Sequence, residues 1–246
     1  MVILAILPGI VLFFMVWRSD KIEKEPPKLL WKLFLFGALT TISTYFIGTA
    51  GDKLIAFLDP TSIIYLLLED FIMVALVEEG GKFFVLKKLT WKHPAFNYTF
   101  DAVVYAVTAS LGFAIIENII YLLDSDMFTA ILRALLSVPG HVMYAIYMGC
   151  YYGMAKVEDT SGNEKTCKTC LIKALLIPVV LHGFYDFCLE SENDLLLLAV
   201  LIFEIVLTVR GVKKLRKLSR EDVAINPILP EEEPEVPGMI YEASNE

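Results

Sequence analysis

Seven apolar stretches divide the chain, and charged or turn-forming residues bound each of them. Because a membrane crossing takes about 20 apolar residues in a helix, these stretches predict transmembrane helices. The predicted spans cover residues 2–17, 29–49, 62–86, 99–123, 128–155, 170–189 and 195–211. The first is short for a full crossing. The pattern therefore predicts an all-α, polytopic membrane bundle of about seven transmembrane helices.

The loops between the predicted spans alternate between basic and non-basic. The loop after span two has only Lys53, and the loops after spans four and six have no basic residue. The other connections and the segment after span seven are basic, with Arg18, Lys21, Lys24 and Lys28, then Lys87, Lys88 and Lys92, then Lys156, Lys165 and Lys168, then Lys213, Lys214, Arg216, Lys217 and Arg220. Since basic loops favour the cytoplasmic side, this alternation predicts an outside N-terminus and a cytoplasmic C-terminus.

Composition agrees with a location in the cell membrane and excludes some partners. Apolar residues make up 57% of the chain, above the roughly 45–50% of soluble domains. Residues 1–218 are therefore predicted to form one transmembrane domain in contact with the lipid bilayer. Much of the net charge of −8 comes from residues 219–246, which we predict to be a disordered, acidic cytoplasmic tail. Neither the charge nor any basic groove indicates a nucleic-acid partner.

Cys167 and Cys170 have the CxxC spacing of a zinc knuckle or a redox pair. The chain has no second pair and no histidine nearby in sequence, so the spacing favours ordinary reduced thiols in a cytoplasmic loop.

Predicted span three contains two acids and a base, Glu78, Glu79 and Lys82. An ionisable group inside the membrane costs about 2.5 kcal/mol or more, so it usually faces a partner, a wet cavity or a metal. Glu78 and Lys82 share one helix face, and Glu79 is turned about 100° away. The structural alternative is a Glu78–Lys82 ion pair that fixes helix packing, with Glu79 facing a headgroup or water. The pair Gly80-Gly81 permits close approach of another backbone.

The next three predicted spans each carry further ionisable groups. Span four holds Glu117 between apolar neighbours, and span five holds His141 just after Pro139-Gly140. On span six His182 and Asp186 are four residues apart, a spacing that suits two metal ligands or a carboxylate that orients an imidazole. Each signal also has a structural alternative. Glu117 would then be an acid near the outer interface, and His141 would make an interhelical hydrogen bond. His182 and Asp186 would form a hydrogen bond that only serves packing.

Together these groups place acids or histidines on four successive spans. Zinc favours His and carboxylate ligands and keeps one position open in catalytic sites. A bound metal lowers the pKa of its water to about 7, and a nearby glutamate can act as general base. Intramembrane acids and histidines also form proton relays. An ion- or proton-coupled transporter and an inactive membrane scaffold therefore remain alternatives to an enzyme.

At these residues the sequence resembles the PrsW family of membrane proteases, within the larger group that includes the CAAX-processing and Abi proteases. The matching elements are Glu78-Glu79-Gly-Gly-Lys82, Phe113-Ala-Ile-Ile-Glu117-Asn118, His141 after Pro-Gly, and His182-Gly-Phe-Tyr-Asp186. The wider group usually has histidine where Glu117 stands and arginine near Lys82, and this departure points to the PrsW branch.

The resemblance implies proteolysis of a membrane-anchored protein substrate, since the bacterial prototype makes the first cut in an anti-sigma factor. Carried over residue by residue, Glu78 and Glu79 would activate water, with Lys82 as the third member of the catalytic motif. His141 and His182 would bind zinc or orient the water, and Glu117 and Asp186 would complete the shell. Phe113 and Asn118 would support it. The chemistry is implied to be either glutamate-dependent or zinc-dependent.

One feature of the predicted spans conflicts with a single site. Glu78 and Glu79 lie toward the cytoplasmic side of their span, whereas Glu117 lies toward the outside. At 1.5 Å per residue the difference in depth exceeds about 10 Å. The prediction therefore requires shifted boundaries, tilted helices or breaks at the prolines for these groups to meet.

Overall fold

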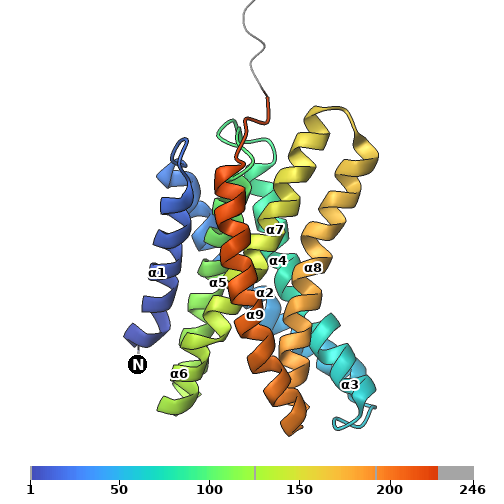
Figure 1. Ribbon diagram of the computed structural model, residues 1–246. Helices are drawn as coiled ribbons and strands as arrows, with labels where there is room; N and C mark the ends of the chain where they lie inside the picture. The colour runs from blue at the N-terminus through green and yellow to red at the C-terminus, as the bar shows by residue number, and fades with distance from the viewer. Residues whose placement is uncertain (1, 125, 192, 227–246) are drawn as a thin grey trace, which may run out of the picture.

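The computed structural model describes residues 2–124, 126–191 and 193–226, and these residues form a helical bundle. Figure 1 shows the long helices running roughly along one axis, with the α1–α2 linker and the α7–α8 loop at the same end. An isolated bridge joins Tyr98 and Ala224. The described elements are α1 (Val2–Ser19), α2 (Pro27–Ile55), α3 (Ile63–Leu68), the π-helical segment η1 (Glu69–Ala75), α4 (Leu76–Thr90), α5 (Asp101–Asp124), α6 (Met127–Leu135), α7 (Ser137–Thr160), α8 (Glu164–Glu190) and α9 (Asp194–Arg220).

The all-α membrane architecture predicted from the sequence is confirmed. Five helical stretches of the described chain are long and apolar enough to cross a membrane: Pro27–Ile55, Asp101–Leu123, Ile131–Thr160, Glu164–Glu190 and Asp194–Arg220. The first predicted span is the shorter apolar helix Ile6–Ser19. The third is divided into α3, η1 and α4 instead of forming one regular helix. A seven-pass topology and the orientation of the termini therefore stay predictions.

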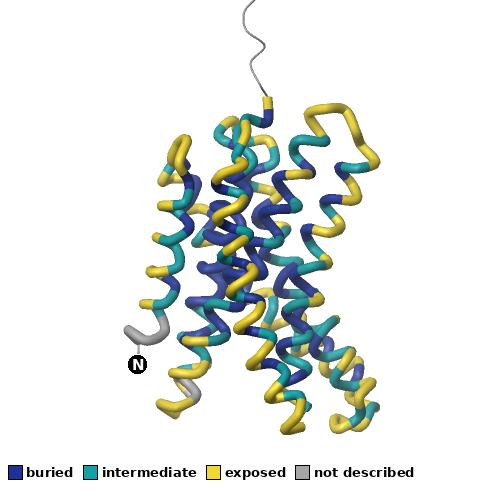
Figure 2. Tube along the Cα trace, viewed as in Figure 1, coloured by how far each residue is buried: buried dark blue, intermediate teal, exposed yellow. Residues whose placement is uncertain are grey.

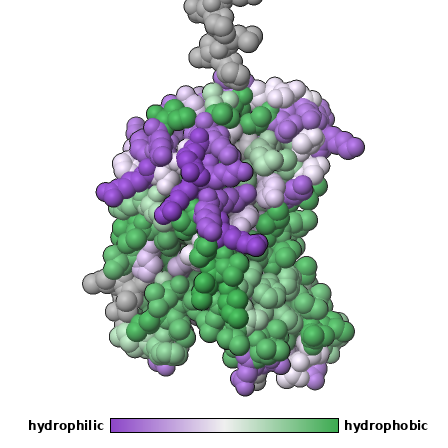
Figure 3. Space-filling view, in the orientation of Figure 1, coloured by the Kyte–Doolittle hydropathy of each residue, from purple (hydrophilic) through white to green (hydrophobic). Residues whose placement is uncertain are grey.

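Burial and hydropathy agree with a bundle surrounded by lipid. Figure 2 shows buried residues gathered along the middle of the bundle and exposed residues on its outer faces. Many exposed side chains are large and apolar, such as Phe57, Leu123 and Leu195. In water such a surface would be an aggregation hazard, but in a bilayer it contacts acyl chains. Figure 3 shows this apolar surface as a broad belt, with hydrophilic residues concentrated at the end of the molecule where the basic loops lie.

Helix α5 forms the centre of the bundle and packs against α1, α2, α4 and α7. Its residues 101–115 are all buried. The contact with α2 is very close, because a Cβ added at Gly37 would lie 2.0 Å from the carbonyl oxygen of Ala109. A Cβ at Gly112 would lie equally close to the carbonyl oxygen of Phe34. Small residues at such contacts let membrane helices gain dispersion energy where the hydrophobic effect is absent.

The α1–α2 linker, the α4–α5 loop, the α7–α8 loop and residues 221–226 lie together, and we call this end of the bundle the basic end. There Asp222 accepts hydrogen bonds from the Thr99 hydroxyl (2.9 Å) and the Phe100 backbone N–H (2.8 Å). The Ile225 N–H donates to the Asn97 carbonyl at 2.7 Å. Residues 219–226, the first part of the predicted disordered tail, are thus packed on the bundle. Residues 227–246 lie outside the described residues.

The CxxC cysteines lie on a helix and not in the predicted loop. Cys167 and Cys170 fall in the first two turns of α8, and the side chains of both are buried. All four cysteines of the chain are free thiols. The pair therefore serves as packing between α8 and Ala155 of α7.

A buried acid in the α1–α2 linker makes stability depend on pH. Glu25 is 2% exposed and accepts a hydrogen bond from the Tyr105 hydroxyl. Burial, together with the nearby Asp101 carboxylate, raises the pKa of Glu25 to about 9 from its ordinary 4.5. Between these two values the folded protein keeps a proton that the unfolded chain has lost. The free energy of unfolding therefore falls as pH rises through this window.

We expect thermal unfolding of the detergent-solubilised protein to shift to lower temperature between pH 7 and 9. Glu25→Gln, which carries no titrating group, should flatten that part of the profile. Glu23→Gln removes an exposed acid of the same linker and should leave the slope unchanged. Equal slopes for wild type and Glu25→Gln would contradict the assignment of the pH dependence to this carboxyl.

Candidate active site

The ionisable residues of α4 follow directly after the π-helical segment η1. Single π-helical turns inside α-helices frequently occur at functional sites. Glu78, Glu79 and Lys82 are 5%, 0% and 1% exposed, so all three point into the protein. The alternative in which Glu79 faces a headgroup or water is therefore wrong. Burial of three charges within two turns requires them to neutralise one another or to bind a further charged group.

Lys82 lies between the two acids. Its Nζ is 2.7 Å from Glu79 Oε1 and 3.4 Å from Glu78 Oε2, so the shorter ion pair is formed with Glu79 and not with the predicted Glu78. The ammonium also lies 4.0 Å from the ring centroid of Phe113, one of the residues predicted to support the site. A third polar contact joins Lys82 Nζ to His141 Nδ1 at 3.2 Å. One cation therefore connects α4 to α7.

His141 lies in the second turn of α7, just after a break in the helix. The predicted fifth span divides at Leu136 into α6 and α7. Pro139 falls in the first turn of α7, where its missing N–H leaves no intrahelical bond unmade. The His141 carbonyl accepts a hydrogen bond from the Ser110 hydroxyl of α5 at 3.0 Å. The break and this bond fix the imidazole at the centre of the bundle, 2% exposed.

The two nitrogens of His141 face different groups. Nδ1 faces Lys82 and Glu79, at 3.2 Å from Nζ and 3.9 Å from Oε1. Nε2 lies 3.1 Å from Glu117 Oε2, and the Arg133 guanidinium is 3.1 Å from the same oxygen. Lys82 can donate to Nδ1 only when the ring proton is on Nε2, where it donates to Glu117. Glu117 therefore fixes the orientation of the His141 ring through Nε2, the nitrogen that faces away from Lys82 and Glu79.

His182 has the same arrangement on α8. Its Nδ1 lies 3.1 Å from Glu79 Oε1, and its Nε2 lies 3.1 Å from Asp186 Oδ2 one turn further along the helix. The imidazole stacks on the Tyr144 ring, with centroids 5.3 Å apart and planes 22° from parallel. The ring centroids of His141 and His182 are 5.0 Å apart. Both histidines thus present Nδ1 to Glu79 and Nε2 to a supporting carboxylate.

The geometry separates the predicted metal ligands into two layers. One ligand atom from each of Glu78, Glu79, His141 and His182 lies within 4.8 Å of the others. Glu117 and Asp186, predicted as ligands, instead contact the far nitrogens of the two imidazoles. Carboxylates in that position fix the tautomer and raise the basicity of a metal-bound histidine. The sequence placed these residues near one another but could not say which nitrogen each acid would face.

A metal ion fits the donor set of this group. Two imidazoles and carboxylates are the ligand types that zinc prefers. Glu79 Oε2 is buried and has no hydrogen-bond partner among the described residues. Lys82 compensates only one of the two carboxylate charges on α4, so the group retains an attraction for a further cation.

The conflict in depth between Glu79 and Glu117 does not arise in the structure. Helix α4 ends at Thr90, four residues beyond the predicted end at 86. Glu79 therefore lies about 6 Å deeper in the bundle than the predicted span implied. His141 lies between the two acids, with Glu79 near one ring nitrogen and Glu117 near the other. The predicted site residues on spans three to six consequently meet in one place.

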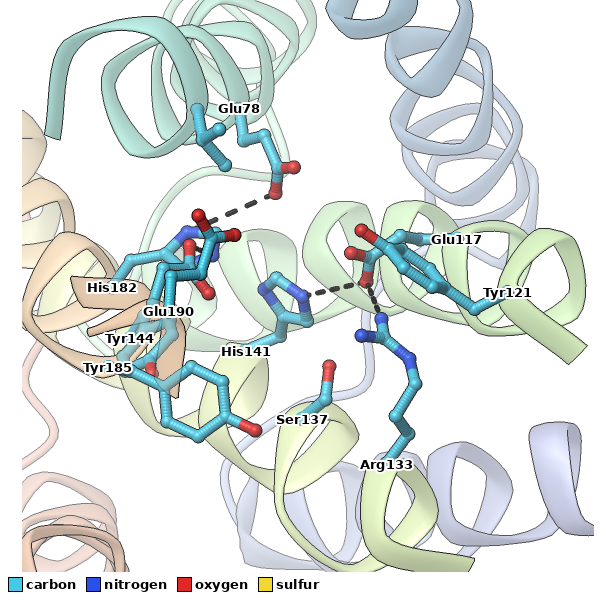
Figure 4. Close-up of a pocket in the computed structure, with 12 residues that line it drawn as sticks. Glu78, Glu117, Tyr121, Arg133, Ser137, His141, Tyr144, His182, Tyr185 and Glu190 are labelled. Atoms are coloured by element: carbon cyan, nitrogen blue, oxygen red, sulfur yellow. Dashed lines mark hydrogen bonds and ion pairs between the residues drawn. The ribbon is translucent and has the colours of Figure 1, made fainter. Parts of the chain in front are cut away.

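A cavity of about 80 Å³ opens beside this group. Figure 4 shows Glu78, His141 and His182 around it, with Glu117 and Arg133 paired on one side. Further lining residues come from the helix ends opposite the basic end, among them Tyr121 near the end of α5 and Glu190 at the end of α8. The cavity therefore extends from the end opposite the basic end to Glu78, His141 and His182. Its size accommodates a few water molecules.

Sequence reasoning missed Asp70 of η1, which is 0% exposed, and a second buried acid near the site. Glu204 of α9 is 3% exposed, and the Tyr144 hydroxyl lies 3.4 Å from its Oε1. It is an isolated acid in the most apolar of the five membrane-crossing helices. That isolation was the available signal, because an acid in such a segment requires a partner inside the protein.

Comparison with known proteins agrees with this arrangement. A family model described as "PrsW family intramembrane metalloprotease" matches residues 25–210, more than half of the chain. "Protease PrsW" of Clostridioides difficile is 34% identical over 219 residues, which cover 87% of this chain and 90% of that protein.

Two further curated proteins of the same name show comparable similarity. The one from Geobacillus kaustophilus is 36% identical over 188 residues, covering 76% of this chain and 78% of the relative. The one from Bacillus subtilis is 30% identical over 220 residues, covering 89% and 96%. No solved structure matches the chain.

Proposed function

The chain belongs to the PrsW family of intramembrane metalloproteases, and we propose that it hydrolyses a peptide bond of a membrane-anchored protein at the Glu78–Glu79–His141–His182 centre. It is a multi-pass membrane protein, because its family consists of intramembrane proteases and its described residues include five helices long and apolar enough to cross a membrane. The proposal assigns residues 1–218 to the protease domain and residues 219–246 to a cytoplasmic tail.

The observation that carries the proposal is the meeting of two acids and two imidazoles beside a polar-lined cavity inside an apolar bundle. The four side chains come from three helices and are 5% exposed or less. Such a group costs free energy in the membrane, and packing alone would be served better by apolar residues. Peptide hydrolysis needs an activated water and a group that polarises the carbonyl, and this set of side chains supplies both.

Within the centre we assign Glu78 as the general base. Glu78 lines the cavity, whereas Glu79 does not. Its contacts are also longer, at 3.4 Å to Lys82 Nζ and 3.9 Å to His182 Nδ1. Glu78 is therefore free to accept a proton from a cavity water as the water oxygen attacks the carbonyl carbon. It returns that proton to the amide nitrogen as the C–N bond breaks.

The remaining members of the group would hold a metal ion and position the water. Glu79 and the Nδ1 atoms of His141 and His182 would make a three-ligand set, which is typical of catalytic zinc sites. The metal ion would replace the Lys82 ammonium as the partner of His141 Nδ1. When bound, zinc supplies Lewis-acid polarisation of the carbonyl and a lowered pKa for the attacking water. Glu117 and Asp186 hold the two rings through their Nε2 atoms. Lys82 holds Glu79 in place through their 2.7 Å ion pair.

The position of the cavity mouth bears on the substrate. We infer from the lining residues that the cavity opens at the end opposite the basic end, and the positive-inside rule predicts that this end lies outside the cytoplasm. A peptide bond just outside the membrane, or in its outer half, would therefore have the shortest route to Glu78. We propose a membrane-anchored regulator of the anti-sigma-factor type as the substrate class.

A tethered reporter tests the proposed activity. The reporter carries a single membrane anchor and a detectable domain on its outer side, and it is co-expressed with wild type or with Glu78→Gln, Glu79→Gln or His182→Ala. We expect cleavage by the wild type and none by the three variants at equal expression. Equal cleavage in all four would disprove a protease centred on these residues. Proton-coupled uptake by proteoliposomes without any cleavage would instead favour a transporter.

A further inference from the structure

A second cavity separates α1 from α2 and is open to the outer surface of the bundle, since Ile10, Phe14 and Trp31 of its wall are 44%, 49% and 64% exposed. Its volume is about 660 Å³, within the roughly 300–1,000 Å³ of small-molecule sites. Helix α1 packs against α5 through Gly9, where an added Cβ would lie 2.9 Å from the Ile115 side chain. The cavity walls are apolar and come from three helices, including Ile6, Ile10 and Phe13 of α1, Leu30 and Phe34 of α2, and Leu111 of α5.

Water is a poor occupant for this cavity. An ordered water makes two to four hydrogen bonds, and this apolar wall offers few partners for them. The wall has one hydroxyl, that of Thr108, and it already donates to the Val104 carbonyl at 2.6 Å. An empty space would cost the wall its dispersion contacts. Since the helices that form the wall lie within the apolar belt, an acyl chain is the occupant that the surroundings supply.

The basic end of the cavity has the composition of a headgroup site. Trp17 and Trp31 line it there, and tryptophan is enriched at the membrane interface. The last turn of α1, the adjacent linker and the first turns of α2 carry exposed basic side chains, namely Arg18, Lys21, Lys24, Lys28 and Lys32.

Two of the three acids in this stretch are withdrawn from the surface. Asp20 and Glu25 are each 2% exposed, which leaves Glu23 as the exposed acid of the linker. The raised pKa of Glu25, about 9, keeps that carboxyl neutral at pH 7. The linker therefore presents net positive charge to the interface, and basic side chains in such a position attract anionic lipids.

We propose that this cavity binds an acyl chain of an anionic glycerophospholipid, whose headgroup lies against the basic residues of the α1–α2 linker. The bound lipid fills the space between α1 and α2 and thereby holds α1 in place beside α5. The site is separate from the proposed catalytic centre and does not depend on catalysis.

The acyl-chain part is tested by filling the cavity. Full-length protein is reconstituted in nanodiscs of phosphatidylcholine with a minor share of phosphatidylglycerol, then extracted in mild detergent. Retained lipid is quantified by mass spectrometry. We expect about one phosphatidylglycerol per wild-type chain and at least a tenfold loss in Ile10→Trp. Val11→Trp is the matched control, because Val11 is exposed on the same helix but does not line the cavity; it should retain the lipid.

The headgroup part is tested by removing charge. In Lys28→Gln/Lys32→Gln, affinity for phosphatidylglycerol should fall about thirtyfold, since each basic residue near a membrane surface adds about a factor of five. Lys213→Gln/Lys217→Gln, which removes the same charge on α9, should leave affinity unchanged. Equal retention of both lipids by wild type would overturn the headgroup assignment. Unchanged retention in Ile10→Trp would overturn the acyl-chain assignment.

Discussion

Glu78→Gln is expected to lower the turnover of a membrane-anchored substrate by about 10²- to 10⁴-fold, the usual contribution of a general base. The side chain lines the cavity and keeps longer contacts than Glu79, so its carboxylate is the one placed to take a proton from a water in the cavity. Glutamine preserves its size and one acceptor oxygen but cannot take up the proton. The loss should therefore appear in kcat with little change in KM. Purified enzyme and a fluorogenic membrane-anchored peptide in detergent micelles provide the measurement.

Two further measurements make this prediction specific to the role of Glu78. Metal content per chain should stay at the wild-type value in Glu78→Gln, because the proposed ligands are Glu79, His141 and His182. Glu190→Gln removes another acid that lines the same cavity and should alter turnover by less than about threefold. If Glu78→Gln retains full turnover while Glu79→Gln loses it with metal still bound, the roles of the two acids are reversed.

The membrane architecture could be predicted from the sequence because it depends on simple periodic properties. Length, hydropathy and alternating loop charge located the long helices to within a few residues at most ends. The internal breaks could not be located in the same way. The interruption at Glu69–Ala75 depends on how η1 packs against α8, where a Cβ at Gly183 would lie 2.6 Å from the Phe71 ring. Such a contact joins residues more than 100 positions apart, and local composition does not record it.

The members of the site could also be predicted, since ionisable residues inside apolar spans are few and costly. Their mutual geometry could not be predicted. Helical spacing indicated a Glu78–Lys82 pair, yet Lys82 is closest to Glu79, because the imidazoles of α7 and α8 also approach that carboxylate. Which ring nitrogen faces which acid depends on three interhelical contacts together. Glu117 and Asp186 could consequently be taken for ligands when only their presence near the histidines was known.

The charges of the centre are interdependent, which explains why α4 carries a lysine among its acids. Glu79 is fully buried and has contacts with Lys82, His182 and His141. In a medium of low dielectric constant, a carboxylate without these partners would take up a proton and lose its value as a ligand. Lys82 therefore offsets the charge of Glu79, while Glu78 and Glu79 Oε2, which has no hydrogen-bond partner among the described residues, still attract a second cation. This balance fits a centre that holds a metal and activates water beside it.

His182→Ala is expected to remove both metal and activity. The change deletes one of three proposed ligands and also leaves the Asp186 carboxylate and Glu79 without their shared imidazole. Loss of an outer-shell partner alone typically costs 10- to 100-fold in metal affinity, so loss of a ligand should exceed that range. Elemental analysis of the purified protein should find about one zinc per wild-type chain and almost none in His182→Ala, with cleavage of the tethered reporter lost in parallel.

His93→Ala is the matched control, because His93 lies in the α4–α5 loop and its Nδ1 accepts a hydrogen bond from the local backbone N–H of Ala95. Active wild-type enzyme without metal would exclude the zinc centre and leave a reaction carried by Glu78 and Glu79 alone. Unchanged zinc in an inactive His182→Ala would instead assign His182 to orienting water, as its contact with Glu79 also permits.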